Sequence, residues 1–166
     1  LQEMSREQRN KDNFSVGNIY YGRVKKVMPA LNAVFVDVGY EKEAFLHYLD
    51  LGSQFRTLQT YVNKAVADRR RVPSLQRTPR QPEVGKSGNI GDVLKVGDPV
   101  LVQVSKEPIN TKGPRLTAEI SIAGRNMVLI PLADGVMVSQ KIKRESERSR
   151  LKQLITSIKP QGFGGY

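Results

Sequence analysis

Two short segments, 33–38 and 43–48, alternate residue types in a way that assigns each side chain to one face of a β-sheet. In the first, three valines occupy every second position, which leaves Phe35 on the opposite face. In the second, Leu46 takes the apolar face and Phe45 the other. If the valines and Leu46 fill a core, both phenylalanines lie outside it on neighbouring strands. This constrains the chain to a small β fold with an aromatic outer surface.

Three further segments show the same period of two residues. Residues 18–29 form the predicted first strand, and the pattern returns at 98–105 and again at 115–121. Five strands in this order, with a long connection before the fourth, predict a mainly β fold. The arrangement is typical of a small Greek-key OB barrel, which we expect to occupy residues 17–122.

The long connection, residues 52–96, differs in composition from the strands around it. It is rich in arginine, lysine, proline and glycine, and it is too long for a plain loop in a compact domain. We therefore predict a basic, proline-rich insertion with a short helix at 57–70 and disorder near 72–90.

The C-terminal part, 123–166, is predicted to be a small α/β appendage. Segments 126–131 and 135–140 resemble a strand pair, and a helix follows with Ser146 as its N-cap. Apolar residues recur at helical spacing and form one face that needs a partner. They are Leu151, Leu154, Ile155 and Ile158.

The chain carries 27 Lys and Arg against 16 Asp and Glu, a formal net charge of +11. Such an excess attracts polyanions, nucleic acid before anionic membrane, because the predicted helix lacks the aromatic groups of a membrane-surface helix. No apolar run approaches the ~20 residues of a membrane span. The absence of cysteine excludes disulfides and thiolate metal sites and fits a reducing, cytoplasmic location.

Catalytic and metal-binding patterns are weak in this sequence. His47 is the only histidine, so a metal site made of several histidines cannot form and a catalytic triad would depend on this one residue. Gly85-Lys86-Ser87 imitates the end of a phosphate-binding P-loop, but Arg80 stands where that motif needs glycine. We therefore predict neither a catalytic residue nor a cofactor within this chain.

The outward phenylalanines suit the stacking of single-stranded bases, which gains about 1–3 kcal/mol per base whatever the base. Stacking faces are predicted for Phe35, Phe45, Tyr21 and His47. Cations predicted to hold the phosphates are Arg23, Lys25, Lys106, Lys112 and Arg115. Other interpretations stay open: the rings pack beneath the insertion or the tail, and the loop 106–115 is an ordinary basic turn. The basic run 141–150 is either a solvated helix start or a second RNA contact.

The chain begins at Leu1 rather than at a methionine, and it ends at Tyr166 without a closing element. We therefore expect a piece of a longer protein. Residues 1–16, which are mostly polar, are expected to connect the barrel to a catalytic part that is missing here.

Five motifs resemble the N-terminal region of bacterial ribonuclease E/G endoribonucleases, with a closer likeness to ribonuclease G. They are Gly17–Val24, Ala33–Gly39, Ala44–Leu46, Thr111–Thr117 and Val138–Ile142. The likeness extends over nearly the whole chain outside 52–90. It implies an S1 RNA-binding domain, which is an OB-fold variant, inserted in a larger catalytic region.

By the same resemblance, Phe35, Phe45 and Lys112 match positions that contact single-stranded RNA. Gly124 and Val128 match part of a pocket that senses a 5′-monophosphate, so the C-terminal appendage is expected to be a partial 5′-sensor. The resemblance also implies a homo-oligomeric parent enzyme that cleaves RNA with Mg²⁺ in rRNA processing and mRNA turnover. The acidic residues that bind this Mg²⁺ in the family lie beyond the present chain, and the basic insertion departs from the better-known members.

We therefore expect the chain to bind single-stranded RNA and to position it for cleavage by parts that are absent here. One alternative is a protein-interaction module in which Phe35, Phe45 and the apolar helix face dock other subunits. Another is a ribosome- or translation-associated OB-fold protein, because the barrel alone does not define its target.

Overall fold

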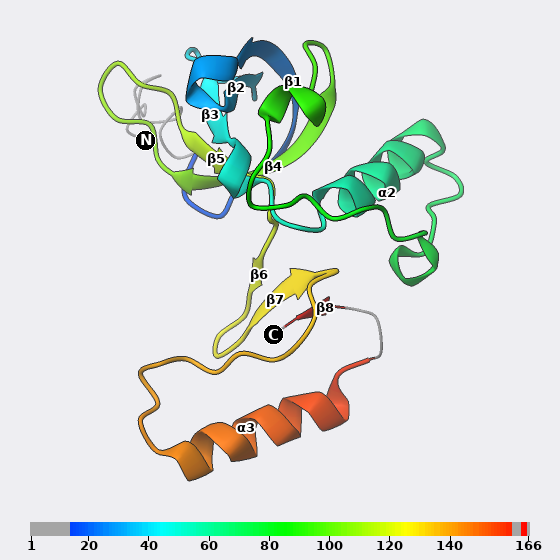
Figure 1. Ribbon diagram of the computed structural model, residues 1–166, viewed down its shortest axis with the longest axis vertical. Helices are drawn as coiled ribbons and strands as arrows, with labels where there is room; N and C mark the ends of the chain where they lie inside the picture. Colours follow the sequence, from blue (N-terminus) through cyan, green and yellow to red (C-terminus); the bar gives the residue numbers. More distant parts are fainter. Residues whose placement is uncertain (1–13, 161–163, 166) are drawn as a thin grey trace, which may run out of the picture. The chain divides into compact units, whose positions relative to one another are not determined.

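The structure is a computed structural model that describes residues 14–160 and 164–165 (Figure 1). Most of the expected N-terminal connection, 1–16, lies outside the described residues. The described residues form two compact units, which lie within Leu1–Val72 with Pro79–Ile120 and within Pro73–Thr78 with Ser121–Tyr166. None of the helices in the described ranges has the length and apolar character needed to cross a membrane.

Five strands close the first unit into a barrel, in the order β1-β2-β3-β5-β4. They are β1 (Ile19–Met28), β2 (Ala33–Asp37), β3 (Ala44–His47), β4 (Pro99–Lys106) and β5 (Arg115–Thr117). Neighbouring strands are antiparallel, except that β3 and β5 run parallel. Figure 1 shows these strands gathered around a common interior, and the predicted five-stranded OB-type barrel is confirmed.

The interior is filled by the alternate residues that the sequence pattern assigns to it. Val34, Val36 and Leu46 are fully buried, and so are the three inward valines of β4. Burying a side chain of this size contributes roughly 1.5–3 kcal/mol. Gly22 lets β1 and β2 approach closely, because a Cβ there would lie 2.7 Å from the Asp37 carbonyl oxygen.

The last barrel strand, β5, is shorter than the strand predicted at 115–121. The Ala118 N–H and the Thr117 hydroxyl both donate to the Asp50 carbonyl oxygen, at 2.9 and 3.0 Å. Asp50 belongs to η2 (Tyr48–Asp50), the 3-10 turn that follows β3. The chain leaves the β-ladder after Thr117 because this turn, and not a neighbouring strand, accepts its next hydrogen bonds.

An irregularity in β1 changes which of its side chains face outward. Val24 lies opposite Val36, but the next paired residue of β1 is Lys26, which lies opposite Phe35. One extra residue in one strand of an antiparallel pair is a β-bulge, and it re-aims the side chains around it. Strict alternation would turn Lys26 inward, whereas the bulge places it on the outer face with Phe35. The valine after it returns to the interior.

The helix α2 (Phe55–Ala67) confirms the helix predicted at 57–70, although it begins and ends earlier than expected. Val62 is buried, and the Gln59 side-chain amide donates to the Pro99 carbonyl oxygen at the start of β4. The basic insertion is therefore attached to the barrel through one face of a regular helix.

The prediction of disorder near 72–90 is wrong for the stretch that returns to β4. Val84 and Ile90 are buried in the same core cluster as the barrel valines. Asn32 binds this stretch through its side chain, accepting from the Ile90 N–H at 2.7 Å and donating to the Gly88 carbonyl oxygen at 2.8 Å. The stretch is ordered because it supplies apolar side chains that complete the core. It ends in η4 (Ile90–Asp92).

The second unit contains a sheet in the order β6-β7-β8 together with the helix α3. Its elements are η3 (Leu75–Arg77), β6 (Ile122–Ala123), β7 (Val128–Pro131), α3 (Glu145–Ile158) and β8 (Gly164–Gly165). The strand predicted at 126–131 is confirmed by β7, but the strand predicted at 135–140 is wrong. Arg148 of α3 donates to the carbonyl oxygens of Val138 and Ser139 at 3.2 and 2.7 Å. An arginine side chain therefore occupies acceptors that a strand partner would use.

The start of α3 also differs from the prediction. Arg144, and not Ser146, occupies the N-cap position, and its side chain makes no capping hydrogen bond. Instead, the acidic residues of the first turn interact favourably with the positive end of the helix dipole, which stabilises the start of the helix. One of them, Glu147, accepts a hydrogen bond of 2.7 Å from Arg150, and this bond lowers the pKa of the Glu147 carboxyl.

Candidate nucleic-acid interface

The two phenylalanines lie next to each other on the outer face of the barrel. Phe35 of β2 and Phe45 of β3 are direct register partners, with ring centroids 5.9 Å apart and an angle of 67° between the rings. Both rings are partly exposed, whereas Val34 and Leu46 next to them in sequence are fully buried. Two adjacent rings that are open to solvent on one side can stack further aromatic groups, such as bases.

These rings belong to a line of register partners that crosses four strand junctions of the barrel. We call it the aromatic row, and it consists of Lys26 (β1), Phe35 (β2), Phe45 (β3), Arg115 (β5) and Lys106 (β4). Directly opposed residues share one face of a sheet, so all members of the row lie on the outer face. Cations stand on both sides of the rings, the arrangement expected of a surface that stacks bases and holds phosphates.

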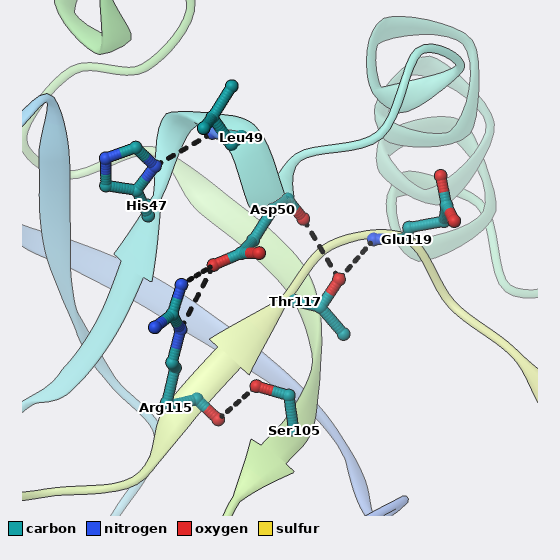
Figure 2. A network of polar contacts seen from close by, with 7 residues as sticks. All are labelled: His47, Leu49, Asp50, Ser105, Arg115, Thr117 and Glu119. Carbon is teal, nitrogen blue, oxygen red and sulfur yellow. Dashed lines mark hydrogen bonds and ion pairs between the residues drawn. The ribbon is translucent and has the colours of Figure 1, made fainter.

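Arg115 is the register partner of Phe45. The carboxylate of Asp50 holds its side chain, as Figure 2 shows. The Arg115 Nε and Nη2 donate to the Asp50 Oδ2 at 3.2 and 2.8 Å. The Arg115 carbonyl oxygen accepts from the Ser105 hydroxyl at 3.1 Å. A guanidinium has five N–H groups, so this ion pair orients the side chain and leaves other donors for a phosphate.

His47 extends the aromatic surface along β3. Its ring centroid lies 6.4 Å from that of Phe45, with an angle of 38° between the rings. Its Nδ1 accepts a hydrogen bond of 3.0 Å from the Leu49 N–H, as Figure 2 shows. This bond fixes the orientation of the ring and assigns the proton of the neutral imidazole to Nε2. An anchored ring beside Phe45 suits stacking.

Tyr21, Arg23 and Lys25 lie farther along β1 on the same outer face. Tyr21 is 44% exposed. Arg23 donates to a backbone carbonyl of the turn before β4 at 2.7 Å, and Lys25 forms an exposed ion pair of 3.7 Å with Asp37. At ~3.3 Å per residue, Tyr21 stands roughly 16 Å along the strand from Lys26. The structure therefore places Tyr21 apart from the aromatic row, whereas Lys25 directly precedes Lys26. The contact of all three residues with RNA remains a prediction.

Lys112 is exposed on the loop between β4 and β5. Two contacts tie this loop to β3 and its approach. The Phe45 N–H donates to the Pro114 carbonyl oxygen at 2.9 Å. Gly113 lies so close to the Glu43 carbonyl oxygen that a Cβ would overlap it. The structure thus brings Lys112 near Phe45, as the sequence interpretation requires, while its role in RNA binding remains a prediction.

Replacing Gly113 by alanine is expected to displace this loop, because the added Cβ meets the Glu43 backbone carbonyl, which cannot rotate away. We expect a loss of about 1–3 kcal/mol in the free energy of unfolding and a several-fold loss of affinity for single-stranded RNA. Urea denaturation and oligonucleotide titration measure the two effects. Gly91→Ala is the matched control, because space around Gly91 is open. Equal behaviour of the two variants would contradict the close approach.

Gly124 and Val128, which the resemblance assigns to a 5′-phosphate pocket, lie at the β6–β7 hairpin of the second unit. The Gly124 N–H donates to the Met127 carbonyl oxygen at 2.7 Å. Val128 lies opposite Ala123 and is 44% exposed. Both residues therefore belong to one exposed hairpin, and their role as a phosphate sensor remains a prediction.

By the resemblance, the Mg²⁺ of the family is held by acidic residues that lie beyond the present chain. Within 14–160 and 164–165, no three His, Asp or Glu side chains are arranged to hold a metal ion. We therefore derive no chemical step through a metal from this part of the chain.

Two members of the candidate interface, Lys26 and Asp50, are missing from the sequence-based prediction. A single β-bulge brings Lys26 to the outer face, and no local residue pattern predicts this bulge. The ion pair between Asp50 and Arg115 joins positions 65 residues apart, so neither neighbourhood alone suggests it. Asp50 lies three residues after His47, which is predicted to stack, and this proximity in sequence is its link to the predicted interface.

Comparison with known proteins gives two family matches. Residues 13–119 match the S1 RNA binding domain, and residues 121–166 match the ribonuclease E/G family. The chain is 41% identical over 150 residues to ribonuclease E of Synechocystis sp.. It is 39% identical over 140 residues to ribonuclease G of Haemophilus influenzae, and 38% identical over 140 residues to ribonuclease G of Escherichia coli K12.

The alignments cover most of this chain and a small part of each relative. They include 90% of the chain but 18% of the Synechocystis protein, and 84% of the chain but 25% of each ribonuclease G. The chain therefore spans a quarter or less of the length of these relatives. The identities do not separate the two names, so the expected closer likeness to ribonuclease G is not distinguished from a likeness to ribonuclease E.

Proposed function

Because this chain belongs to the S1 RNA-binding domain family and is homologous to the N-terminal part of ribonucleases E and G, we propose that its barrel binds single-stranded RNA across the aromatic row. The observation that carries the proposal is the register pairing of Phe35 and Phe45, flanked by cations on both sides. Both rings gain from stacking any base, so the expected binding is tolerant of sequence.

The RNA held in this way is positioned for cleavage by another region of a longer protein, in the manner expected of a ribonuclease E/G enzyme. In this proposal the S1-type domain covers 17–122, and the segment 123–166 contributes Gly124 and Val128 to a sensor of the RNA 5′-phosphate. A homo-oligomeric, cytoplasmic enzyme acting in rRNA processing and mRNA turnover is the corresponding cellular role. Support comes from the ribonuclease E/G match over 121–166.

The test is a salt titration of affinity for a fluorescent oligo(U). If Lys26, Arg115, Lys106 and Lys112 each neutralise one phosphate, the slope of log K against log salt is about −3, at roughly −0.7 per contact. Affinity then falls ~50-fold between 50 and 200 mM salt. A sulfated polysaccharide serves as the control polyanion, because it has charge but no bases. Binding of the polysaccharide as tightly as oligo(U) would show charge attraction without base stacking and would refute the proposal.

A protein-interaction module is the second candidate function, and one observation favours it. No residue of α3 is buried in the described part, and Leu154 and Ile158 on its apolar face are 47% and 63% exposed. Sedimentation in the presence and absence of oligo(U) separates the two functions. RNA binding by a monomer supports the first, whereas dimerisation without RNA binding supports the second.

A further inference from the structure

The β-bulge in β1 places two consecutive lysines on the outer face of the barrel in different surroundings. Lys26 is the register partner of Phe35, whereas Lys25 falls in the bulge itself. Both side chains are exposed. Bulges re-aim single side chains and recur next to functional sites. The two lysines therefore differ in their surroundings although they are adjacent in sequence.

Their charge partners differ. The Lys25 ammonium lies 3.7 Å from the Asp37 carboxylate, in an ion pair whose side chains are 54% and 47% exposed. No ion pair within 4.0 Å is formed by Lys26 with any residue of the described ranges. A phosphate can therefore bind Lys26 without displacing a carboxylate, whereas at Lys25 it meets the negative charge of Asp37.

The position of Lys26 relative to the rings suits a phosphate contact. Neighbouring strands lie about 4.8 Å apart, so Lys26 stands one strand from Phe35 and two from Phe45. Arg115 occupies the equivalent place on the other side of Phe45. Two bases stacked on the rings would thus have a cation at each end of their backbone.

We infer that Lys26, turned outward by the bulge, binds the RNA phosphate next to the base stacked on Phe35. The strand of RNA then crosses β2 and β3 from Lys26 to Arg115. This part of the row spans three strand spacings, roughly 14 Å along the barrel surface, and the ring centroids are 5.9 Å apart. About three nucleotides cover this length at roughly one strand spacing per nucleotide. The inference rests on the proposed function.

The experiment compares Lys26→Ala with Lys25→Ala, which remove the same charge from adjacent positions. Fluorescence anisotropy with U4 and U12 is measured at several salt concentrations. We expect Lys26→Ala to weaken U4 binding about fivefold or more and to reduce the magnitude of the salt slope by about one. Lys25→Ala is expected to have a clearly smaller effect. Lys64→Ala, on the exposed side of α2, should remain close to the unchanged protein.

The outcomes separate this inference from the proposed function. If the unchanged protein binds U12 and loses affinity when Phe35 and Phe45 are truncated, the proposed function stands. Equal losses of RNA affinity in Lys26→Ala, Lys25→Ala and Lys64→Ala would then overturn the inference about Lys26 and leave the proposed function intact. Lys26→Arg is expected to retain binding and Lys26→Gln to lose it, with circular dichroism confirming that each variant folds. Retained binding in a folded Lys26→Gln protein would also overturn the inference.

Discussion

Truncating both Phe35 and Phe45 to alanine is expected to lower the affinity for single-stranded RNA by up to about 100-fold while leaving the barrel folded. Each ring offers a stacking gain of about 1–3 kcal/mol, so a single truncation costs roughly tenfold. The rings contact each other at 5.9 Å between centroids. Because each truncation also removes a contact of the remaining ring, the two losses are not independent, and the double variant is expected to lose somewhat less than the product of the single losses.

Oligo(U) titration of the two single variants and the double variant measures this effect, with urea denaturation run on the same samples. Because both rings are partly exposed, their loss is expected to cost the fold less than the loss of a fully buried side chain. Tyr61→Ala is the aromatic control, since Tyr61 is a partly buried residue of α2 outside the row. RNA affinity that stays unchanged in both single variants would show that Phe35 and Phe45 do not stack bases.

The largest effect on stability is expected from Leu116→Ala in β5. Leu116 is fully buried and pairs with Leu46 of the parallel neighbour β3. Removing a buried leucine side chain to alanine costs about 2–5 kcal/mol, because the cavity left behind is only partly filled by relaxation. In a domain of this size that is a large share of the total free energy of unfolding.

Urea denaturation is the measurement, and Leu49→Ala is the matched control. Leu49 is 66% exposed in η2, so the same chemical change there should alter the free energy of unfolding by about 0.5 kcal/mol or less. RNA affinity of the fraction of Leu116→Ala that remains folded should be close to normal. Comparable destabilisation by the two leucine substitutions would contradict the assignment of Leu116 to the core.

Phe35 and Phe45 lie on the outer face of the barrel and Leu116 in its interior, and the sequence predicts this division of the side chains well. Alternation along β2 and β3 assigns Phe35 and Phe45 to the outside and Val34 and Leu46 to the core, and the structure agrees. The five strands were also predictable, because each carries its own period of two. The strand predicted at 135–140 does not form, because the side chain of Arg148 in α3 donates to the backbone carbonyl oxygens that a neighbouring strand would otherwise use.

The insertion is more ordered than its amino-acid composition predicts. Proline, glycine and arginine suggest disorder near 72–90, yet Val84 and Ile90 complete the barrel core. Burial of a few apolar side chains offsets the entropy of ordering a polar segment. Whether a particular valine reaches a core depends on the space that distant strands leave open, and local composition does not contain that information.

What the sequence determined by itself is the set of side chains that can meet RNA: Phe35, Phe45 and an excess of basic residues. The direction of a side chain in an extended strand is a local property of the backbone, so it can be inferred without a partner strand. Only the tertiary structure decided which of these residues stand in one line. Register depends on hydrogen bonds between distant strands, and one bulged residue moves Lys26 into the aromatic row. The bond between Asp50 and Arg115 likewise exists only once β3 and β5 lie side by side.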